Sequence, residues 1–486
     1  MNATIPKIFI TLLLSCSIAA SIAPTSADCD VVGVADAALG SIAARAYTRH
    51  FSAGLAVAVV RNGKLAYAEG FGFADPSRVV PVTPQTPFAI GSLSKQFTAA
   101  IALQLVEQHR LALDDTIARW LPMLPNARTI TVRELLNQTS GLHNYPDLAE
   151  HPWPTGGRIH IARLLRFMAL DRPDFSPGSR WEYSNTNYTA LAAIESAVAS
   201  RPYAALLQQR IFSRLKMSQS GLGYLAQRGL HPAVPFLAGA SGIEPVPPAQ
   251  QLSLDLYSGA GGIVSSADDL ARWDIALLGG RLLGPAMNRL WWSPGRLADG
   301  AATNYGMGWV IADLDGRREL WHNGFAPGAG GFCFNALFPR EGLAIVILSN
   351  TGGFAVDGDA PLRHLAAQLA RAALPADFVE RAAPGEDPAV TRRVEALWAA
   401  YRARKPPLAE MEPAFAALFT PAFTGSIAKG IGALGTPKRW VFLGKSVLGA
   451  GLTLYRYRIE LRDGSSPIFA VAIDGAGKIA GSRLLP

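Results

Sequence analysis

The chain has 486 residues, of which 49% are hydrophobic and 17% are charged. This composition excludes a disordered chain and a coiled coil, and the length is sufficient for a large core that needs no disulfide support. A formal net charge of +8 would suit nucleic acid or an anionic surface. The basic residues are scattered, however, with no run of five or more, so we expect no nucleic-acid partner.

The N-terminal residues resemble a targeting segment. Lys7 precedes a short apolar run over 8–14, and small residues follow up to Ala27. This order predicts a secretory signal peptide over 1–27 and hence a secreted or periplasmic protein. An alternative is a lipoprotein signal ending in Leu-Leu-Ser-Cys16, in which lipid attachment at Cys16 would anchor the protein to a membrane. No later segment is apolar for long enough to predict an integral membrane span.

Cleavage after Ala27 would leave two cysteines, Cys29 and Cys333. Exported proteins form disulfides readily, so the two could pair. Cys333 lies in the apolar run Phe-Cys-Phe, which favours the alternative of an unpaired and buried thiol.

Taken in chain order, the first predicted elements indicate a sheet that is covered by helices. A helix over 35–50 is followed by two strands that flank Asn62-Gly63, the dipeptide most typical of a tight hairpin. A long helix begins near Ser92, and because residues 97–103 carry no charge on any face it should be buried. Capping-box spacings start further helices at Thr131 and Ser266. Two more strands are expected at 331–338 and 343–349.

These strands come from both ends of residues 28–374, with helices between them. The predicted fold class is therefore α+β: an antiparallel sheet sandwiched by helices, with an inserted helical subdomain. Residues 375–388 are rich in Pro, Ala and charge and predict a linker. A helix and four strands then predict a small α+β accessory domain with a curved antiparallel sheet at 389–486.

Three motifs could carry chemistry. In Ser92-x-x-Lys95 the two side chains share a helix face, and a buried Lys can lose its proton and serve as a base for Ser. The same spacing recurs at 213–216 and 426–429, without a buried helix around it. The second motif, Tyr183-Ser-Asn185, places a phenol for proton relay and an amide for substrate binding on a loop.

The third motif is His322-Asn-Gly324-Phe325. On an edge strand facing a cleft, Gly324 would let substrate backbone approach closely, and the N–H of Phe325 would act as an oxyanion donor. Each motif alone is more typical of an ordinary turn or surface pair. Their order along the chain is what makes them informative.

Together the motifs resemble the serine β-lactamase and penicillin-binding-protein family, in its class C β-lactamase-related branch of peptidases and esterases. Supporting segments occur at 88–98, 135–142, 261–265 and 305–309. The resemblance implies Ser92 as the nucleophile, with Lys95 and Tyr183 sharing the proton transfers. It implies substrate binding by Asn185, His322, Gly324 and Phe325, and an oxyanion hole formed by the N–H groups of Ser92 and Phe325.

The chain departs from β-lactamases where they use a fixed cation. His322 replaces a Lys and is expected to be only partly charged at neutral pH, and Asn323 replaces a Thr. Asn137-Gln138 also differs from the Thr-His often found there, and the sequence offers no role for this change. The preferred function is an exported serine hydrolase that acts on small esters or D-amino-acid-containing peptides. D,D-carboxypeptidase or weak β-lactamase activity is the alternative.

Other classes are less consistent with the sequence. No metal-binding or phosphate-binding motif occurs, so we expect no cofactor and no metal. No Gly-x-Ser-x-Gly occurs, which argues against an α/β-hydrolase. Two hypotheses of another class stay open: a catalytically idle binding or scaffolding homologue, and a C-terminal domain that binds cell-wall anions. The sequence makes no prediction of the oligomeric state.

Overall fold

The computed structural model describes residues 36–485 apart from 51–52, 76, 78, 146–156, 240–241, 315, 327, 329, 353–359, 375–382, 384, 435, 449–450 and 462–466. The predicted signal peptide, Cys16 and Cys29 lie outside the described residues, as does most of the predicted linker. All described residues belong to one compact unit, Gly33–Pro486. Within them, no helix is long and apolar enough to cross a membrane.

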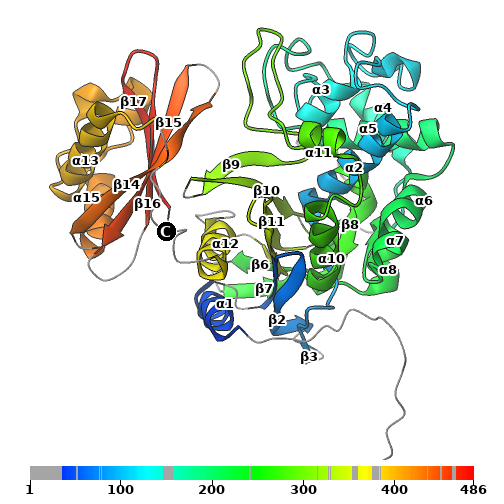
Figure 1. Cartoon of the computed structure of the whole chain (residues 1–486), viewed down its shortest axis with the longest axis horizontal. Coiled ribbons are helices and arrows are strands. Elements are labelled where there is room, and N and C mark those ends of the chain that lie inside the picture. The colour runs from blue at the N-terminus through cyan, green and yellow to red at the C-terminus, as the bar shows by residue number, and fades with distance from the viewer. Residues whose placement is uncertain are drawn as a thin grey trace, which may run out of the picture. The chain divides into compact units, whose positions relative to one another are not determined.

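A seven-stranded sheet with the order β3-β2-β1-β12-β11-β10-β9 forms the centre of the fold (Figure 1). Every neighbouring pair in it is antiparallel. The tight hairpin is confirmed, since Asn62 and Gly63 have φ of 53° and 71° and link β1 to β2. The strands are β1 (Gly54–Arg61), β2 (Lys64–Asp75), β3 (Val80–Pro81), β9 (Val310–Leu314), β10 (Arg317–Phe325), β11 (Phe332–Phe338) and β12 (Leu343–Ser349).

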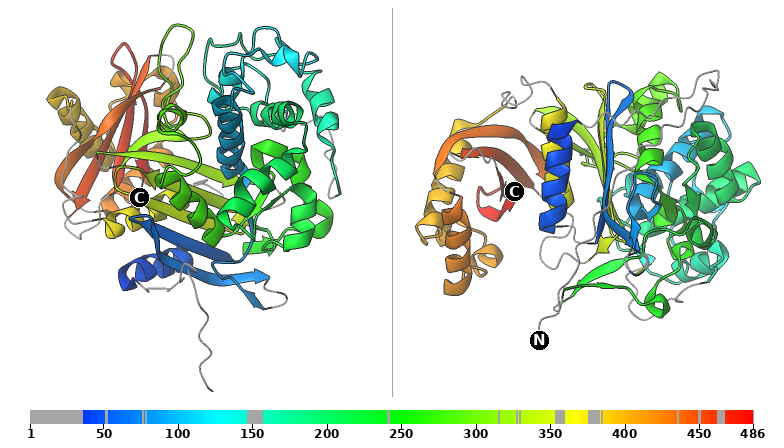
Figure 2. Two further views of the ribbon diagram at one scale, coloured as in Figure 1. Left: turned by 45° about the vertical axis from the view of Figure 1, so that its right-hand side comes forward. Right: turned by 90° about the horizontal axis from the view of Figure 1, so that it is seen from below.

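Helices cover both faces of this sheet, as Figure 2 shows. On one face, α1 (Ala37–His50) and α12 (Ala360–Ala373) pack against side chains such as Val57 and Ile347. On the other face, the core includes Ala56 and Ala58, most of α2 (Ser94–Glu107) and the apolar residues of α10 (Ala267–Leu278). Because successive strand residues point to opposite faces, one apolar strand serves both cores.

Most of the regular elements described between β2 and β9 are helices, and together with the antiparallel sheet they confirm the predicted fold class. Its remaining helices are α3 (Val132–Asn137), α4 (Ile161–Met168), α5 (Asn185–Ala199), α6 (Tyr203–Leu207), α7 (Ser213–Leu215), α8 (Gly223–Leu230), α9 (Ser258–Gly261) and α11 (Pro285–Trp291). Two small sheets accompany them, formed by β4 (Phe88–Ala89), β5 (Gly221–Leu222) and β8 (Ile263–Ser265), and by β6 (Phe236–Gly239), β7 (Gly242–Pro245) and β13 (Thr351–Gly352).

The C-terminal residues build a second sheet with its own core. The strands β14 (Pro437–Leu448), β15 (Leu452–Leu461), β16 (Ile468–Ile473) and β17 (Ile479–Leu485) pair antiparallel in chain order. They bury Tyr457, Ile459 and Val471 against Trp398 and Tyr401 of α13 (Pro388–Arg402). Two further helices belong to this part, α14 (Pro413–Ala416) and α15 (Pro421–Ala433).

Candidate active site

Ser92 and Lys95 lie at the start of the buried helix. Ser92 belongs to a short 3-10 helix, Gly91–Leu93, that runs directly into α2. Lys95 follows in the first turn of α2 and is fully buried. Its Nζ donates to Asn185 Oδ1 at 2.8 Å and to the carbonyl oxygen of Ala260 at 2.7 Å, and it lies 3.1 Å from Ser92 Oγ.

Burial lowers the pKa of Lys95 well below its ordinary value, because desolvation disfavours the ammonium form. A neutral amine has two N–H groups and one lone pair. The two shorter contacts, to Asn185 and Ala260, use the N–H groups. The lone pair is then directed at Ser92, so Lys95 can take the proton of the Ser92 hydroxyl.

Tyr183 meets the same serine oxygen. Its hydroxyl donates to Ser92 Oγ at 2.7 Å, and burial raises the pKa of the phenol above its ordinary value. Tyr183 therefore stays protonated at neutral pH, whereas the lowered pKa of Lys95 favours its free amine. Opposite shifts at one oxygen suit one group to act as a base and the other as an acid.

Gln138 holds the loop that carries Tyr183. Its carbonyl oxygen accepts from the N–H of Glu182 at 3.0 Å, and its Oε1 accepts from the N–H of Ser184 at 3.1 Å. The same Oε1 accepts from Asn187 Nδ2 at 2.5 Å. Gln138 is fully buried and lies in the left-handed region with φ of 64°. It therefore fixes the backbone on both sides of Tyr183.

Asn185 is the first residue of α5 rather than a loop residue. Its backbone N–H and its Nδ2 donate to Asn144 Oδ1 at 2.8 and 3.1 Å. These contacts turn the amide so that its own Oδ1 faces Lys95. Asn144 was not predicted, and no spacing in the sequence points to it.

His322 is buried, with only 1% of it exposed. Its Nδ1 lies 2.5 Å from the carbonyl oxygen of Asn323 and so carries the hydrogen. Its Nε2 lies 3.1 Å from the hydroxyl of Tyr305 and accepts from it. Burial and the nearby Lys95 lower the pKa of His322 to about 3. The predicted partial charge is wrong, because the ring is desolvated and stays neutral at neutral pH.

The sequence predicts an edge strand for His322, and this prediction is wrong. Strand β10 lies between β11 and β9. However, β9 pairs only with residues up to Trp321, whereas β11 pairs along the strand to Phe325. The segment from His322 to Phe325 thus extends past the end of β9, as an edge would.

Gly324 and Phe325 contact the backbone beside the nucleophile. A Cβ on Gly324 would lie 2.0 Å from the carbonyl oxygen of Ile90, and a Cβ on Gly91 would lie 2.5 Å from the nitrogen of Phe325. Gly324 is therefore required by the protein's own packing, and the close approach of substrate at this residue stays a prediction. The contact brings the N–H groups of Ser92 and Phe325 onto neighbouring segments, where two donors can stabilise an oxyanion.

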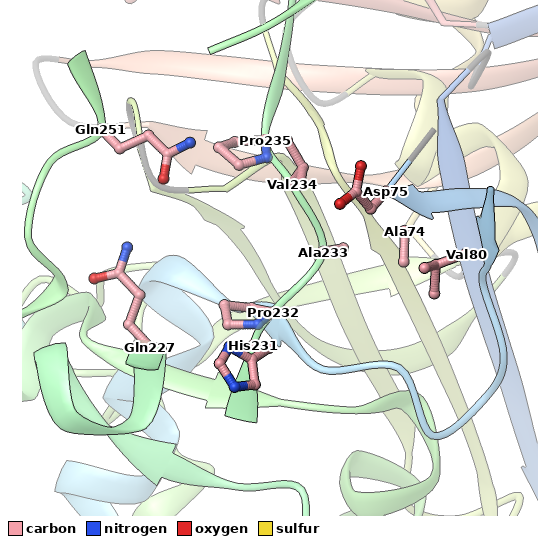
Figure 3. Close-up of a pocket in the computed structure, with 10 residues that line it drawn as sticks. All are labelled: Ala74, Asp75, Val80, Gln227, His231, Pro232, Ala233, Val234, Pro235 and Gln251. Atoms are coloured by element: carbon pink, nitrogen blue, oxygen red, sulfur yellow. The ribbon is translucent and has the colours of Figure 1, made fainter. Parts of the chain in front are cut away.

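A separate cavity of about 360 Å³ contains none of the predicted site residues (Figure 3). It is lined by Ala74, Asp75, Val80, Gln227, His231, Pro232, Ala233, Val234, Pro235 and Gln251. Its polar side chains are one carboxylate, two amides and an exposed imidazole, with no hydroxyl or thiol that could act as a nucleophile. Cys333 lies elsewhere, buried and unpaired among the described residues.

Comparison with known proteins assigns the chain to a family. A family model described as Beta-lactamase matches residues 43–370. A putative penicillin-binding protein, PbpX of Bacillus subtilis (strain 168), is 31% identical over 60% of this chain and 68% of its own length. A D-aminopeptidase of Brucella canis is 30% identical over 65% of this chain and 59% of its own length.

Two solved structures share the fold. The D-amino acid amidase from Ochrobactrum anthropi SV3 aligns with a TM-score of 0.60 at 23% identity, over 69% of this chain and 97% of its own. The octameric penicillin-binding protein homologue from Pyrococcus abyssi aligns with a TM-score of 0.58 at 18% identity, over 92% of this chain and 97% of its own. The chain therefore belongs to the β-lactamase family and is a serine hydrolase related to β-lactamases and penicillin-binding proteins.

Proposed function

We propose that the protein hydrolyses small esters or D-amino-acid-containing amides and peptides through an acyl-enzyme at Ser92. The observation that carries this proposal is the position of Ser92 Oγ, between the Nζ of Lys95 and the hydroxyl of Tyr183. A serine becomes an effective nucleophile when an adjacent group can take its proton.

Each residue then has a definite role. Lys95 accepts the proton of Ser92 as the oxygen attacks the carbonyl, and Tyr183 donates a proton to the departing group. Water attacks the acyl-enzyme in the second half of the reaction, with the proton transfers reversed. Asn185 orients Lys95, and the N–H groups of Ser92 and Phe325 stabilise the negative oxygen of the tetrahedral intermediates.

The neutral state of His322 guides the choice of substrate. Both of its nitrogens are bonded to protein groups, so the ring supplies neither a positive charge nor a free donor for a substrate carboxylate. This favours an uncharged ester or amide over a peptide ending in a free carboxylate and over β-lactams. The D-aminopeptidase and D-amino acid amidase relatives are consistent with that choice.

Active-site labelling tests the nucleophile. A fluorophosphonate probe should label the wild type and leave Ser92→Ala unlabelled. Ser426→Ala is the matched control, since Ser426 has the same spacing to a Lys but is exposed on α15. Labelling that persists in Ser92→Ala, or none in the wild type, would contradict the proposal and favour an idle homologue.

A panel of substrates tests which class of substrate the enzyme prefers. Rates should be highest for simple esters and D-amino acid amides, and lowest for nitrocefin and for peptides ending in D-Ala-D-Ala. Efficient release of terminal D-Ala would instead support the carboxypeptidase alternative. L-amino acid amides serve as the stereochemical control.

We also propose the export and the division of the chain predicted from its sequence. Residues 1–27 would be removed on export, which N-terminal sequencing of the mature protein would show. Residues 28–374 would form the catalytic domain and 389–486 an accessory domain. Limited proteolysis should then cut first within 375–388, and an intact chain under those conditions would argue against the boundary.

A further inference from the structure

Trp181 is an exposed aromatic side chain close to the proposed nucleophile. Its exposed fraction is 40%, and the other tryptophans in the described part of the chain are buried or half-buried. An indole combines a large apolar surface with one polar N–H, which suits a half-exposed Trp to contact the apolar part of a ligand.

A short series of ring contacts links Trp181 to Ser92. The indole centroid lies 5.9 Å from the ring of Tyr305, which is itself buried. The Tyr305 ring packs edge-on against Tyr183 with a centroid distance of 6.4 Å. The hydroxyl of Tyr183 bonds to Ser92 Oγ, so the indole is two rings removed from the reacting oxygen.

The backbone next to Trp181 is held in place. The N–H of Glu182 donates to the carbonyl oxygen of Gln138, and the N–H of Gly178 donates to the carbonyl oxygen of Thr139. The indole is therefore presented to solvent by a fixed segment. A rigid aromatic surface loses little conformational entropy when a ligand covers it.

The charges beside Trp181 compensate each other. Arg180 and Glu182 form an ion pair at 2.7 Å, and the Arg180 guanidinium also lies over the ring of Phe175 at 4.6 Å. Arg180 disfavours a second cation at this place, and Glu182 disfavours an anion. An uncharged aromatic or bulky apolar group is the ligand that this surface suits best.

We propose that Trp181 is a specificity-determining residue whose indole binds an aromatic or bulky apolar group of the substrate. This inference rests on the proposed hydrolase function and names the substrates that the same site prefers: aromatic esters, and amides of D-amino acids with aromatic side chains.

Kinetics with matched substrates test the proposal. Wild type, Trp181→Ala and Trp181→Phe are assayed with ethyl phenylacetate against ethyl acetate, and with benzyl acetate against methyl acetate. In Trp181→Ala the aromatic preference in kcat/KM should fall about tenfold or more for one pair, and Trp181→Phe should restore most of it. Phe423→Ala is the control, because Phe423 is 43% exposed on α15 and should leave both ratios unchanged.

Unchanged ratios for both pairs in Trp181→Ala would overturn the proposal, and so would an equal loss for aromatic and small esters. Binding is measured separately by calorimetry in the Ser92→Ala background, with phenylacetamide against acetamide. If the wild type hydrolyses no substrate but Trp181→Ala removes the preference for phenylacetamide, the proposed function fails and the Trp181 site stands. If hydrolysis is normal and neither preference depends on Trp181, only the Trp181 site fails.

Discussion

Replacement of Gly324 by Ala should disable the enzyme through a backbone collision. The new Cβ would lie 2.0 Å from the carbonyl oxygen of Ile90, whereas ordinary contact begins at 3.4 Å. One of the two backbone segments must therefore move by more than 1 Å, because a carbonyl oxygen cannot rotate away as a side chain can. Ser92 and Phe325 flank this contact, so the displacement separates the two proposed oxyanion donors.

The expected magnitude follows from two general observations. A misplacement of about 1 Å costs about 100-fold in rate, and loss of one oxyanion donor costs about 100- to 1,000-fold in kcat. We expect kcat for a p-nitrophenyl ester to fall by about 100-fold or more in Gly324→Ala. Overpacking of this kind should also lower the free energy of unfolding by about 1–3 kcal/mol.

Gly229→Ala is the matched control. Gly229 lies on α8 without a positive φ, and no heavy atom lies within 4 Å of a Cβ built there. This variant should keep wild-type turnover and gain about 0.5–1 kcal/mol of stability, because Ala is favoured over Gly in a helix. Wild-type kcat and melting temperature in Gly324→Ala would refute the reasoning about the backbone contact.

Three further predictions concern buried polar groups. Gln138→Met leaves the Ser184 N–H and Asn187 Nδ2 without their acceptor, and each unsatisfied donor should lower the free energy of unfolding by about 1–3 kcal/mol. Steady-state kinetics should show that kcat falls more than KM rises. Gln138→Glu keeps an acceptor at this place and should recover activity if loss of the acceptor is the cause. Burial lowers the pKa of Lys95, so kcat/KM should reach its plateau at a pH well below the ordinary Lys pKa and fall at lower pH as the amine is protonated; a profile that rises only near the ordinary Lys pKa would contradict this. Glu195 has no hydrogen-bond partner among the described residues and burial raises its pKa, so its contribution to stability is present at low pH and lost as pH rises through the raised pKa. Glu195→Gln should therefore melt further above the wild type as the pH is raised from about 5, and a difference that stays constant with pH would argue against this.

Elements specified by neighbouring residues were predicted well. The Asn62-Gly63 hairpin needs only two residues that accept positive φ, and the helix at Thr131 begins with the predicted reciprocal capping box to Glu134. The order of the central sheet was not predictable in this way. Its pairing of Leu55 with Ser349 depends on packing between parts of the chain that are far apart in sequence.

The active site shows the same contrast between what motifs predict and what depends on contacts between distant parts of the chain. The motif order predicted that Ser92, Lys95 and Tyr183 would meet, and the structure brings them together. The role of Gln138 was not foreseeable, because its bonds to Ser184 and Asn187 span 46 and 49 residues and leave no local pattern. The neutral state of His322 was missed for a related reason, since burial and the Tyr305 contact arise only in the folded chain.

The three groups that contact Lys95 Nζ also have a consequence for folding kinetics. They come from the residue three positions before Lys95, from a helix 90 residues away and from a carbonyl 165 residues away. Formation of the local helices cannot bring these groups together, because two of them are far from Lys95 in the sequence. Segments that far apart dock only after local structure has formed. Recovery of esterase activity during refolding should therefore lag behind the return of the helical circular dichroism signal and report the final docking of the helical region.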